Sequence, residues 1–397
     1  HVLGYCGIDN NGLSGIEKFF DVKLQNEKSS LKLSIDVRIQ HVVRDELFKA
    51  VSEFKAKGGN AMVMDLKTGE MLAMVSLPDF DPNLPNQNDQ KATFNRNTLG
   101  VYEPGSTFKI LNIAIALESG SASLKSVYDA TNPVKIGRFT VTDFRGKNRI
   151  LSLAESFIYS SNIAAIKIAQ QFGMETQKSY LNKFGLFEAT TVEVPEIGQP
   201  LIPAAWSPVT TMTVSYGYGV SVTPLQVLTT VSGIINDGYK PQPTLLFDET
   251  GGGKQIKSNP IISEKTSKII RTFMRINGKE GPGKRADQGK FKVFVKTGTA
   301  YQAKFGNYGA VKSRTNSAVG GFPYDNPRYV FLVVLDDPQP TTSTHGFAAA
   351  GWNAAPTAGK IIARIAPILG VQPADNDEPE VTAPGWTSVK HQRVESD

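Results

Sequence analysis

Hydrophobic residues recur along most of the chain at spacings that distinguish helices from strands. Residues 1–33 are polar and have no clear period, so we expect a connector there. Val37, Val43, Leu47 and Phe54 then mark the apolar side of an amphipathic helix over residues 36–57, which we expect Gly58-Gly59 to end. The same kind of spacing predicts helices at residues 106–118, 152–171, 223–236, 263–276 and 354–369.

Short apolar runs predict the strands. Two of them, residues 61–66 and 70–76, are separated by Lys67-Thr68-Gly69, which is typical of a hairpin. A loop rich in Pro, Asn and Asp follows over residues 78–97, and later strands are predicted at residues 290–295, 316–322 and 328–335. Because strands come first, helices follow and strands return, the pattern predicts an α+β fold whose mostly antiparallel sheet is completed late in the chain.

Composition and charge exclude several classes of protein. The 397 residues are 40% hydrophobic and 20% charged, which is an ordinary globular mixture, and no apolar run approaches the 18 residues of a membrane span. The net charge is 43 − 37 = +6, but the basic residues are scattered and do not alternate with aromatic ones, so no nucleic-acid partner is expected. The single cysteine, Cys6, excludes an internal disulfide. The tail from Val371 is rich in Pro and acidic residues and is expected to be loosely ordered.

Several catalytic chemistries lack the residues they need. The four histidines are spread over a terminus, a charged helix, a loop and the tail, and neither G-x-S-x-G nor H-E-x-x-H occurs. A histidine-based serine triad and a zinc hydrolase site are therefore not expected, and no metal or cofactor is predicted. Residues 278–284 nearly match a phosphate-binding loop, but Arg285 stands where Ser or Thr must hold magnesium, so a solvated basic loop is expected.

The remaining chemistry uses a serine activated by a lysine. S-x-x-K occurs three times, and composition alone predicts about two such matches, so context must choose among them. Two copies, at Ser29 and Ser52, lie in a polar connector and on a charged helix face. Ser106 instead precedes an almost uncharged helix whose positive end favours developing negative charge. Lys109 lies one turn later on the same face, where apolar neighbours disfavour its ammonium form and leave an amine able to accept the hydroxyl proton.

Two further motifs complete this set. Ser160-Ser161-Asn162 is the only S-x-N, and it lies within a helical pattern. Its first hydroxyl is suited to passing a proton between amines, and the amide of Asn162 to holding a substrate carbonyl. Lys296-Thr297-Gly298-Thr299 ends the predicted strand at residues 290–295, and Gly298 permits close approach of a substrate backbone. The other K-T-G copy, at Lys67, needs no more than turn chemistry. Each motif alone is weak, but the three together mark the penicillin-binding and β-lactamase group.

The chain resembles the transpeptidase domain of class B penicillin-binding proteins, most closely the septal, cell-division type. The resemblance covers residues 1–370, and the tail of the chain, residues 371–397, lies outside it. It extends well beyond the three motifs to segments at residues 1–4, 12–17, 58–76, 95–96, 102–109, 216–219, 222–226 and 283–286. It implies that residues 1–33 end an N-terminal pedestal domain and that residues 34–370 form the penicillin-binding domain.

The resemblance also implies a β-lactamase/transpeptidase-like fold, in which a five-stranded antiparallel sheet is flanked by helices. By matching positions, Ser106 would be the acylated nucleophile and Lys109 its base. The second motif would supply the proton relay, Ser160, and the contact to the substrate amide, Asn162. In the third motif Lys296 and Thr297 would bind the substrate carboxylate, and the backbone N–H groups of Ser106 and Thr299 would form the oxyanion hole.

The implied reaction is peptidoglycan cross-linking. The D-Ala-D-Ala end of a stem peptide would acylate the serine, and the amine of a neighbouring stem would then take the acyl group, while β-lactams would acylate the same serine and remain. The chain would work without a cofactor at the periplasmic face of the bacterial cytoplasmic membrane, with a single N-terminal anchor missing before His1. Its expected partners are a membrane glycan polymerase and division proteins. A D,D-carboxypeptidase and a non-catalytic penicillin sensor remain open, whereas no E-x-x-x-N segment of a class A β-lactamase lies between Asn162 and Lys296.

Overall fold

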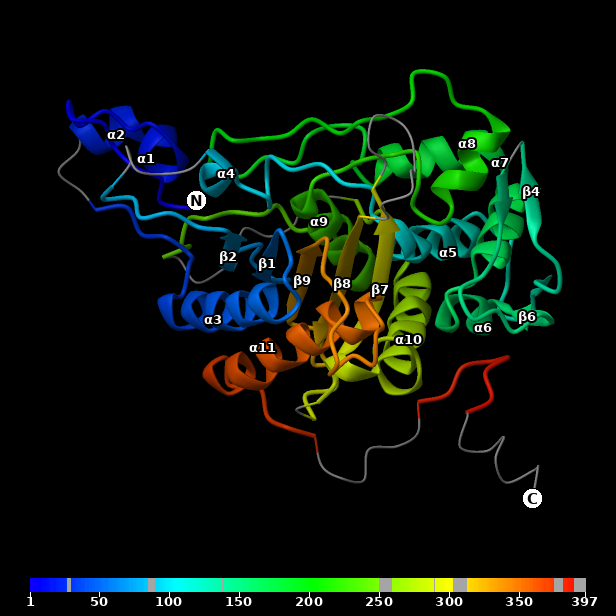
Figure 1. Ribbon diagram of the computed structural model, residues 1–397. Helices are drawn as coiled ribbons and strands as arrows, with labels where there is room; N and C mark the ends of the chain where they lie inside the picture. Colours follow the sequence, from blue (N-terminus) through cyan, green and yellow to red (C-terminus); the bar gives the residue numbers. More distant parts are fainter. Residues whose placement is uncertain are drawn as a thin grey trace.

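A five-stranded antiparallel sheet forms the centre of the molecule (Figure 1). The structure is a computed structural model that describes residues 1–26, 30–84, 90–137, 139–249, 259–288, 290–302, 313–374 and 381–388. The strands lie in the order β2-β1-β9-β8-β7, so two strands from the start of the chain pair with three from its end. The expected α+β fold with a five-stranded antiparallel sheet is confirmed.

The strands of this sheet are almost entirely buried. They are β1 (Gly58–Asp65), β2 (Met71–Leu77), β7 (Phe294–Tyr301), β8 (Arg314–Phe322) and β9 (Tyr329–Asp336). In the middle of the sheet Met62 pairs with Met74 on one side and with Leu332 on the other. Both faces of the sheet are covered by helices, and this explains why β9 is a continuous hydrophobic run instead of an alternating one.

Helices cover each face of the sheet and create two apolar cores. One face packs against α3 (Val37–Glu53) and α11 (Ala354–Ile368). The other packs against α5 (Lys109–Glu118), α9 (Pro224–Ile235) and α10 (Glu264–Glu280). Every residue of α9 is buried, and so are eight of the ten residues of α5, which is why their sequences carry few charges.

Smaller elements extend from the central layers. On the left in Figure 1 are α1 (Gly15–Phe19), α2 (Asp21–Asn26) and the N-terminus, while α6 (Leu153–Ile158), α7 (Asn162–Lys183) and α8 (Pro208–Val214) lie on the right. Two small hairpin-like pairs accompany α6 and α7 on that side: β3 (Val127–Asp129) with β6 (Ile150–Ser152), and β4 (Val134–Ile136) with β5 (Phe139–Val141). The short helix α4 (Gln90–Thr93) and the 3₁₀ turns η2 (Gly105–Phe108), η3 (Lys284–Ala286) and η4 (Ala350–Trp352) complete the described elements.

The structure corrects five of the predictions about where elements begin and end. The N-terminal connector contains α1 and α2, which are too short to show a period, and Gly58-Gly59 begins β1 in addition to following α3. The helix predicted over residues 152–171 is two helices, α6 and α7, separated by Ser160, whose φ of 58° is left-handed. The strand predicted at residues 290–295 is wrong at its start, because Lys290 and Lys292 have left-handed φ values and only Phe294 and Val295 of that range belong to β7. β7 starts at Phe294, so Lys296 lies inside the strand and does not end it.

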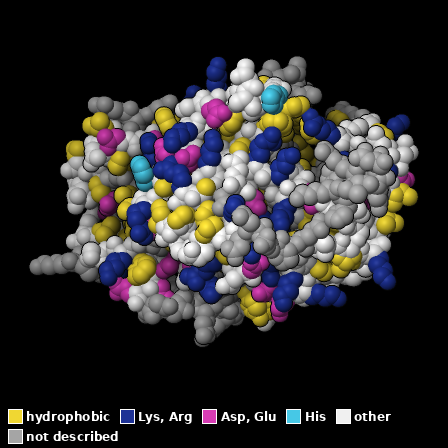
Figure 2. All heavy atoms as spheres, turned by 90° about the horizontal axis from the view of Figure 1, so that it is seen from below, with side chains coloured by type: hydrophobic (Ala, Val, Ile, Leu, Met, Phe, Trp, Pro, Cys, Tyr) yellow, Lys and Arg dark blue, Asp and Glu magenta, His cyan; other side chains and the backbone are white. Residues whose placement is uncertain are grey.

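The surface and the tail add two observations. Figure 2 shows Lys and Arg side chains interspersed with Asp and Glu on the face it presents, in agreement with the scattered charge of the sequence. None of the described helices is both long and apolar enough to cross a membrane. In the predicted loose tail, residues 381–388 pack against the body of the protein, while residues 375–380 and 389–397, including His391, lie outside the described part.

Candidate active site

The segment that carries the predicted nucleophile, Ser106, lies against the edge strand of the sheet; it is called the nucleophile segment below. Ser106 is in the 3₁₀ turn η2, directly before α5, so it begins a helix as predicted. Gly105 has a φ of 56°, and a Cβ there would meet the Thr299 carbonyl oxygen at 3.1 Å. Its N–H donates to the Gly217 carbonyl oxygen at 3.0 Å, and a Cβ on Gly217 would lie only 1.9 Å from the Gly105 oxygen. Two glycines in close contact therefore fix the segment that carries Ser106.

Lys109 lies at the beginning of α5 with only 2% of its surface exposed. Its Nζ donates to the Ser160 carbonyl oxygen at 2.5 Å and to Asn162 Oδ1 at 2.7 Å. A neutral amine has two N–H groups, so these two acceptors satisfy it fully. Burial lowers the pKa of Lys109 to about 7, although the carboxylate of Asp143 opposes the shift. A substantial fraction of this amine is thus uncharged near neutral pH.

The Ser160 hydroxyl lies between two buried amines. Its Oγ is 3.2 Å from Lys109 Nζ and 3.0 Å from Lys296 Nζ. Lys296 is fully buried, and its Nζ also donates to the Thr297 carbonyl oxygen at 3.0 Å. Burial, and secondarily the charge of Lys109, hold the pKa of Lys296 well below its usual range. The three groups form a short hydrogen-bonded path along which a proton can pass.

The left-handed backbone at Ser160 places this hydroxyl. The last turn of α6 closes with Ser160 N–H donating to the Phe157 carbonyl oxygen at 3.1 Å. Ser161 then caps α7 by accepting from Ala164 N–H at 3.0 Å. Holding a serine at positive φ costs on the order of 1–3 kcal/mol, so the surrounding contacts must stabilise the turn.

Two of the predicted substrate-binding residues have close neighbours within the protein. A Cβ on Gly298 would lie 2.6 Å from Ser317 Oγ and 3.0 Å from the Pro104 carbonyl oxygen, so the nucleophile segment itself makes the close approach there. Thr299 Oγ1 accepts a hydrogen bond from Ala350 N–H at 3.1 Å, which ties β7 to the start of η4. The third residue, Thr297, is 6% exposed.

Besides Asn162, the sequence predicts four catalytic side chains. Three of them form the hydrogen-bonded path, and Ser106 is the one that does not. Within the described part of the chain, no hydrogen bond involves its hydroxyl, which is half-buried. The structure therefore brings Lys109, Ser160, Asn162 and Lys296 into direct contact, with Ser106 one turn before Lys109. Asn162 Nδ2 donates to the Thr142 carbonyl oxygen at 3.1 Å, so a substrate carbonyl would compete with that acceptor.

Asp143 is the residue that the sequence argument missed. Its carboxylate accepts hydrogen bonds from Ser161 Oγ at 2.6 Å, Asn162 N–H at 2.5 Å and Ile163 N–H at 3.0 Å. These donors are the positive N-terminal end of α7, where a carboxylate is favoured. Asp143 comes from the β5–β6 loop and not from the helix sequence, so the usual capping pattern cannot reveal it. It fixes the backbone immediately after Ser160.

The alternative motif copies that the structure describes lie outside this site. Ser52 is exposed near the end of α3, and Lys55 is exposed at a left-handed φ, as expected for solvated residues. Lys67 is exposed in the β1–β2 hairpin, where its N–H donates to Asp65 Oδ1 at 2.8 Å. The remaining S-x-x-K serine, Ser29, lies outside the described residues. Among the described residues, no group of three or more His, Cys, Asp or Glu side chains is arranged to hold a metal ion.

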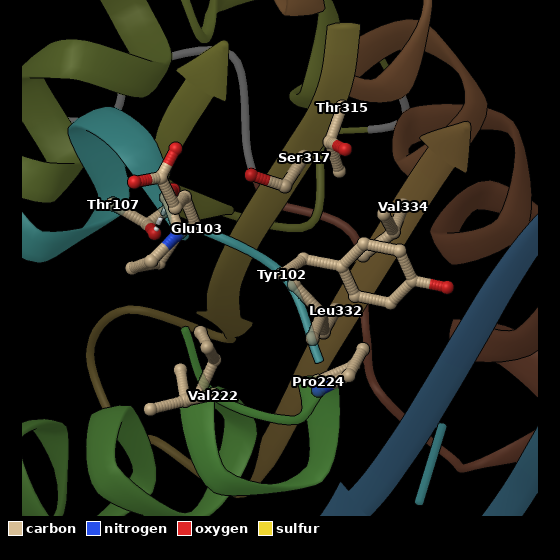
Figure 3. Close-up of a pocket in the computed structure, with 11 residues that line it drawn as sticks. Tyr102, Glu103, Thr107, Val222, Pro224, Thr315, Ser317, Leu332 and Val334 are labelled. Carbon is tan, nitrogen blue, oxygen red and sulfur yellow. Dashed lines mark hydrogen bonds between the residues drawn. The ribbon is translucent and has the colours of Figure 1, made fainter. Parts of the chain in front are cut away.

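A cavity lies beside the nucleophile segment (Figure 3). Its empty volume, including the open mouth, is about 350 Å³. Tyr102, Glu103 and Thr107 line it together with Ser317 and Leu332 of the sheet. None of the groups in the hydrogen-bonded path lines it.

Comparison with known proteins gives the site a family context. Residues 59–363 match the family model described as penicillin binding protein transpeptidase domain. The chain is 35% identical over 385 residues to the "Probable peptidoglycan D,D-transpeptidase FtsI" of Caulobacter vibrioides, covering 94% of this chain and 65% of that protein. It is 32% identical to "Stage V sporulation protein D" of Bacillus subtilis, covering 95% and 64%. The chain thus spans just under two thirds of the length of these curated relatives.

Solved structures show the same fold. Penicillin binding protein 3 from Mycobacterium tuberculosis, complexed with ampicillin, matches with a TM-score of 0.84 at 27% identity, covering 97% of this chain and 90% of that one. The transpeptidase domain of Burkholderia pseudomallei penicillin-binding protein 3 matches with a TM-score of 0.76 at 28% identity, covering 88% and 98%.

Proposed function

This chain belongs to the family of penicillin-binding protein transpeptidase domains, of the class B, FtsI type, and on that premise we propose that it is a peptidoglycan D,D-transpeptidase of septal wall synthesis. The observation that supports the proposal most directly is the Ser160 hydroxyl between two buried amines, 3.2 Å from Lys109 and 3.0 Å from Lys296. Such a path removes a proton from one oxygen and delivers it to a leaving amine without a histidine.

In the first step, Ser106 Oγ attacks the carbonyl carbon of the penultimate D-Ala. The neutral form of Lys109, whose pKa is lowered to about 7, takes the hydroxyl proton as the Oγ–C bond forms. The C–N bond to the terminal D-Ala then breaks, and the proton reaches the leaving nitrogen through the Ser160 hydroxyl. The products are a serine ester and free D-Ala. The backbone N–H groups of Ser106 and Thr299 stabilise the negative oxygen of the tetrahedral intermediate.

In the second step, the amine of a neighbouring stem peptide attacks the ester carbonyl. Its proton passes back through the same groups to Ser106 Oγ, which leaves as the new peptide bond forms. Before the first step, Lys296 and Thr297 bind the carboxylate of the incoming D-Ala-D-Ala end, and Asn162 contacts the substrate amide. A β-lactam enters by the first step, but its ring-opened leaving group stays attached, so the serine ester persists.

The wider organisation follows from the same premise. Residues 34–370 form the penicillin-binding domain, residues 1–33 are the end of a pedestal domain, and residues 371–397 are a tail. The protein works at the periplasmic face of the cytoplasmic membrane, held by an N-terminal anchor. A membrane glycan polymerase and division proteins are its partners.

Labelling with a fluorescent penicillin tests the proposal. One stable adduct is expected, on Ser106 by peptide mapping, and Ser106→Ala is expected to lose it. Ser52→Ala and Lys67→Ala are matched controls at the alternative motif copies, and both are exposed, so they are expected to label like the parent. Labelling of Ser106→Ala at the parent's level would refute the assignment.

Turnover separates the competing activities. Cross-linked product from a donor and an acceptor stem peptide supports the transpeptidase. Release of D-Ala without an acceptor supports a D,D-carboxypeptidase, and labelling with no turnover of either substrate supports a penicillin sensor.

A further inference from the structure

Residues 381–388 of the C-terminal tail bind back onto the part of the molecule that carries Ser160. This segment, here called the strap, lies below α6 on the right of Figure 1. Ala383 is 7% exposed and Ser388 6%, although the tail composition predicts a loose segment. Val381 and Trp386 pack against the same apolar core as α5, α9 and α10.

Two hydrogen bonds attach the strap to the outer ends of two helices. Ser152, the N-cap residue of α6, donates from its Oγ to the Gly385 carbonyl oxygen at 2.6 Å. Ser388 Oγ donates to Glu280 Oε1 at 2.9 Å, and Glu280 is the last residue of α10. At the other end of α6, Asn277 Nδ2 of α10 donates to the Ile158 carbonyl oxygen at 3.1 Å. The strap and Asn277 therefore hold the two ends of α6 against α10.

The strap also covers Tyr159, the residue directly before Ser160. The ring of Trp386 packs on Tyr159 with centroids 5.3 Å apart and planes inclined by 54°. Lys147 Nζ lies 4.5 Å from the centroid of the same Tyr159 ring. Tyr159 is the C-cap residue of α6, and the following residue is Ser160 at its left-handed φ. A strained residue stays in place only when its surroundings fix it, and the strap contacts Tyr159, the residue directly before Ser160.

We propose that the strap positions the proton relay: Trp386 and Gly385 hold α6 and Tyr159 so that the Ser160 hydroxyl remains between Lys109 and Lys296. Trp386 and Gly385 are positioning residues, since neither is among the contacts of the reacting groups. The inference rests on the proposed function, because it concerns the rate at which Ser106 is acylated.

Two features of the strap allow sharp variants in the full chain. The indole N–H of Trp386 is buried and has no hydrogen-bond partner within the described residues, so Trp386→Phe keeps an aromatic ring and removes no bond. Gly385 has a φ of 77°, and a Cβ there would lie 2.7 Å from Ser152 Cβ, so Gly385→Ala displaces the strap from α6 without touching Trp386. Thr387→Ala, at an exposed neighbour in the strap, is the matched control.

The experiment measures acylation of the full chain by a fluorescent penicillin over a range of concentrations. An aromatic pair of this kind changes an equilibrium about two- to tenfold. We expect Trp386→Ala and Gly385→Ala to lower the rate at saturation by about three- to tenfold, with the half-saturating concentration unchanged. Trp386→Phe and Thr387→Ala should remain within about twofold of the parent.

The outcomes separate the two proposals. An unlabelled parent chain overturns the proposed function itself. With a labelled parent, the strap's role is overturned if Trp386→Ala and Gly385→Ala acylate within twofold of the parent, if only the half-saturating concentration changes, or if Trp386→Phe loses as much rate as Trp386→Ala. Should Trp386→Ala fail to fold, Gly385→Ala and Trp386→Phe still decide the question by the same criteria.

Discussion

Replacing Asp143 by Asn tests how the loop before α6 controls the base. The carboxylate accepts three hydrogen bonds from the start of α7, including one from Ser161 Oγ. Asn has nearly the same shape but one acceptor oxygen and no charge, so at least one of these bonds is lost. A hydrogen bond to a charged group contributes about 1.5–3 kcal/mol. We therefore expect Asp143→Asn to destabilise the beginning of α7 by about 2 kcal/mol.

The effect on catalysis has two parts of known sign. Since Asn162 is one of the capped residues and Ser160 adjoins them, their displacement from Lys109 should lower the acylation rate on the pH plateau by about tenfold, which corresponds to about 1.4 kcal/mol. The carboxylate of Asp143 raises the pKa of Lys109 against the effect of burial, so its removal lets that pKa fall below about 7. The base must be neutral to act, and its neutral form then exists at lower pH. The acidic limb of the pH profile should therefore move to lower pH while the plateau drops.

The assay is the second-order rate of penicillin acylation between pH 5 and 9, together with the melting temperature. The parent rate should rise through a midpoint near 7. The melting temperature of Asp143→Asn should fall by about 2–4 °C. Asp129→Asn is the matched control, because Asp129 is an exposed carboxylate 3.8 Å from Lys167 on the same helix, and it should change neither rate nor midpoint. A midpoint that stays in place or moves to higher pH in Asp143→Asn would refute the electrostatic reasoning.

Two further predictions concern packing and buried charge. Gly217→Ala should lower the stability of the fold by about 3 kcal/mol or more and abolish most penicillin labelling, because its Cβ would lie 1.9 Å from the Gly105 oxygen. Gly219→Ala is the control: Gly219 is equally left-handed, but its Cβ would face only a side-chain oxygen at 3.2 Å, so labelling should be retained. Equal losses in both variants would refute the steric argument. Lys240 donates to the Phe184 carbonyl oxygen at 2.8 Å, and burial lowers its pKa to about 8, below its unfolded value, so the parent gains stability as the pH rises from about 8 towards 10.5. Lys240→Met should lack this gain when its free energy of unfolding is measured by chemical denaturation. Over this pH range the stability of the parent relative to Lys240→Met should therefore rise by about 2 kcal/mol, and a difference in stability that does not depend on pH would contradict the lowered pKa.

Local sequence was sufficient to predict the elements whose hydrophobic pattern is regular. The hairpin β1–β2 and the helices α3, α5, α9, α10 and α11 were predicted because each has a regular hydrophobic period or an apolar run with a clear turn. Prediction failed where the backbone leaves the common regions. Ser160, Lys290 and Lys292 have positive φ, which divides one predicted helix and delays one strand, and hydrophobic spacing carries no information about the sign of φ.

The sequence by itself determined the chemistry that is possible here: which serine precedes an uncharged helix, which lysine follows it by one turn, and which motifs accompany them. Only the tertiary structure decided how acidic the amines are and what holds them, because burial and contact depend on segments far apart in the chain. Lys109 and Lys296 share one hydroxyl across 187 residues, Asp143 caps a helix to which it does not belong, and Trp386 covers the residue before Ser160. The desolvation that makes an amine a base arises only when those segments meet.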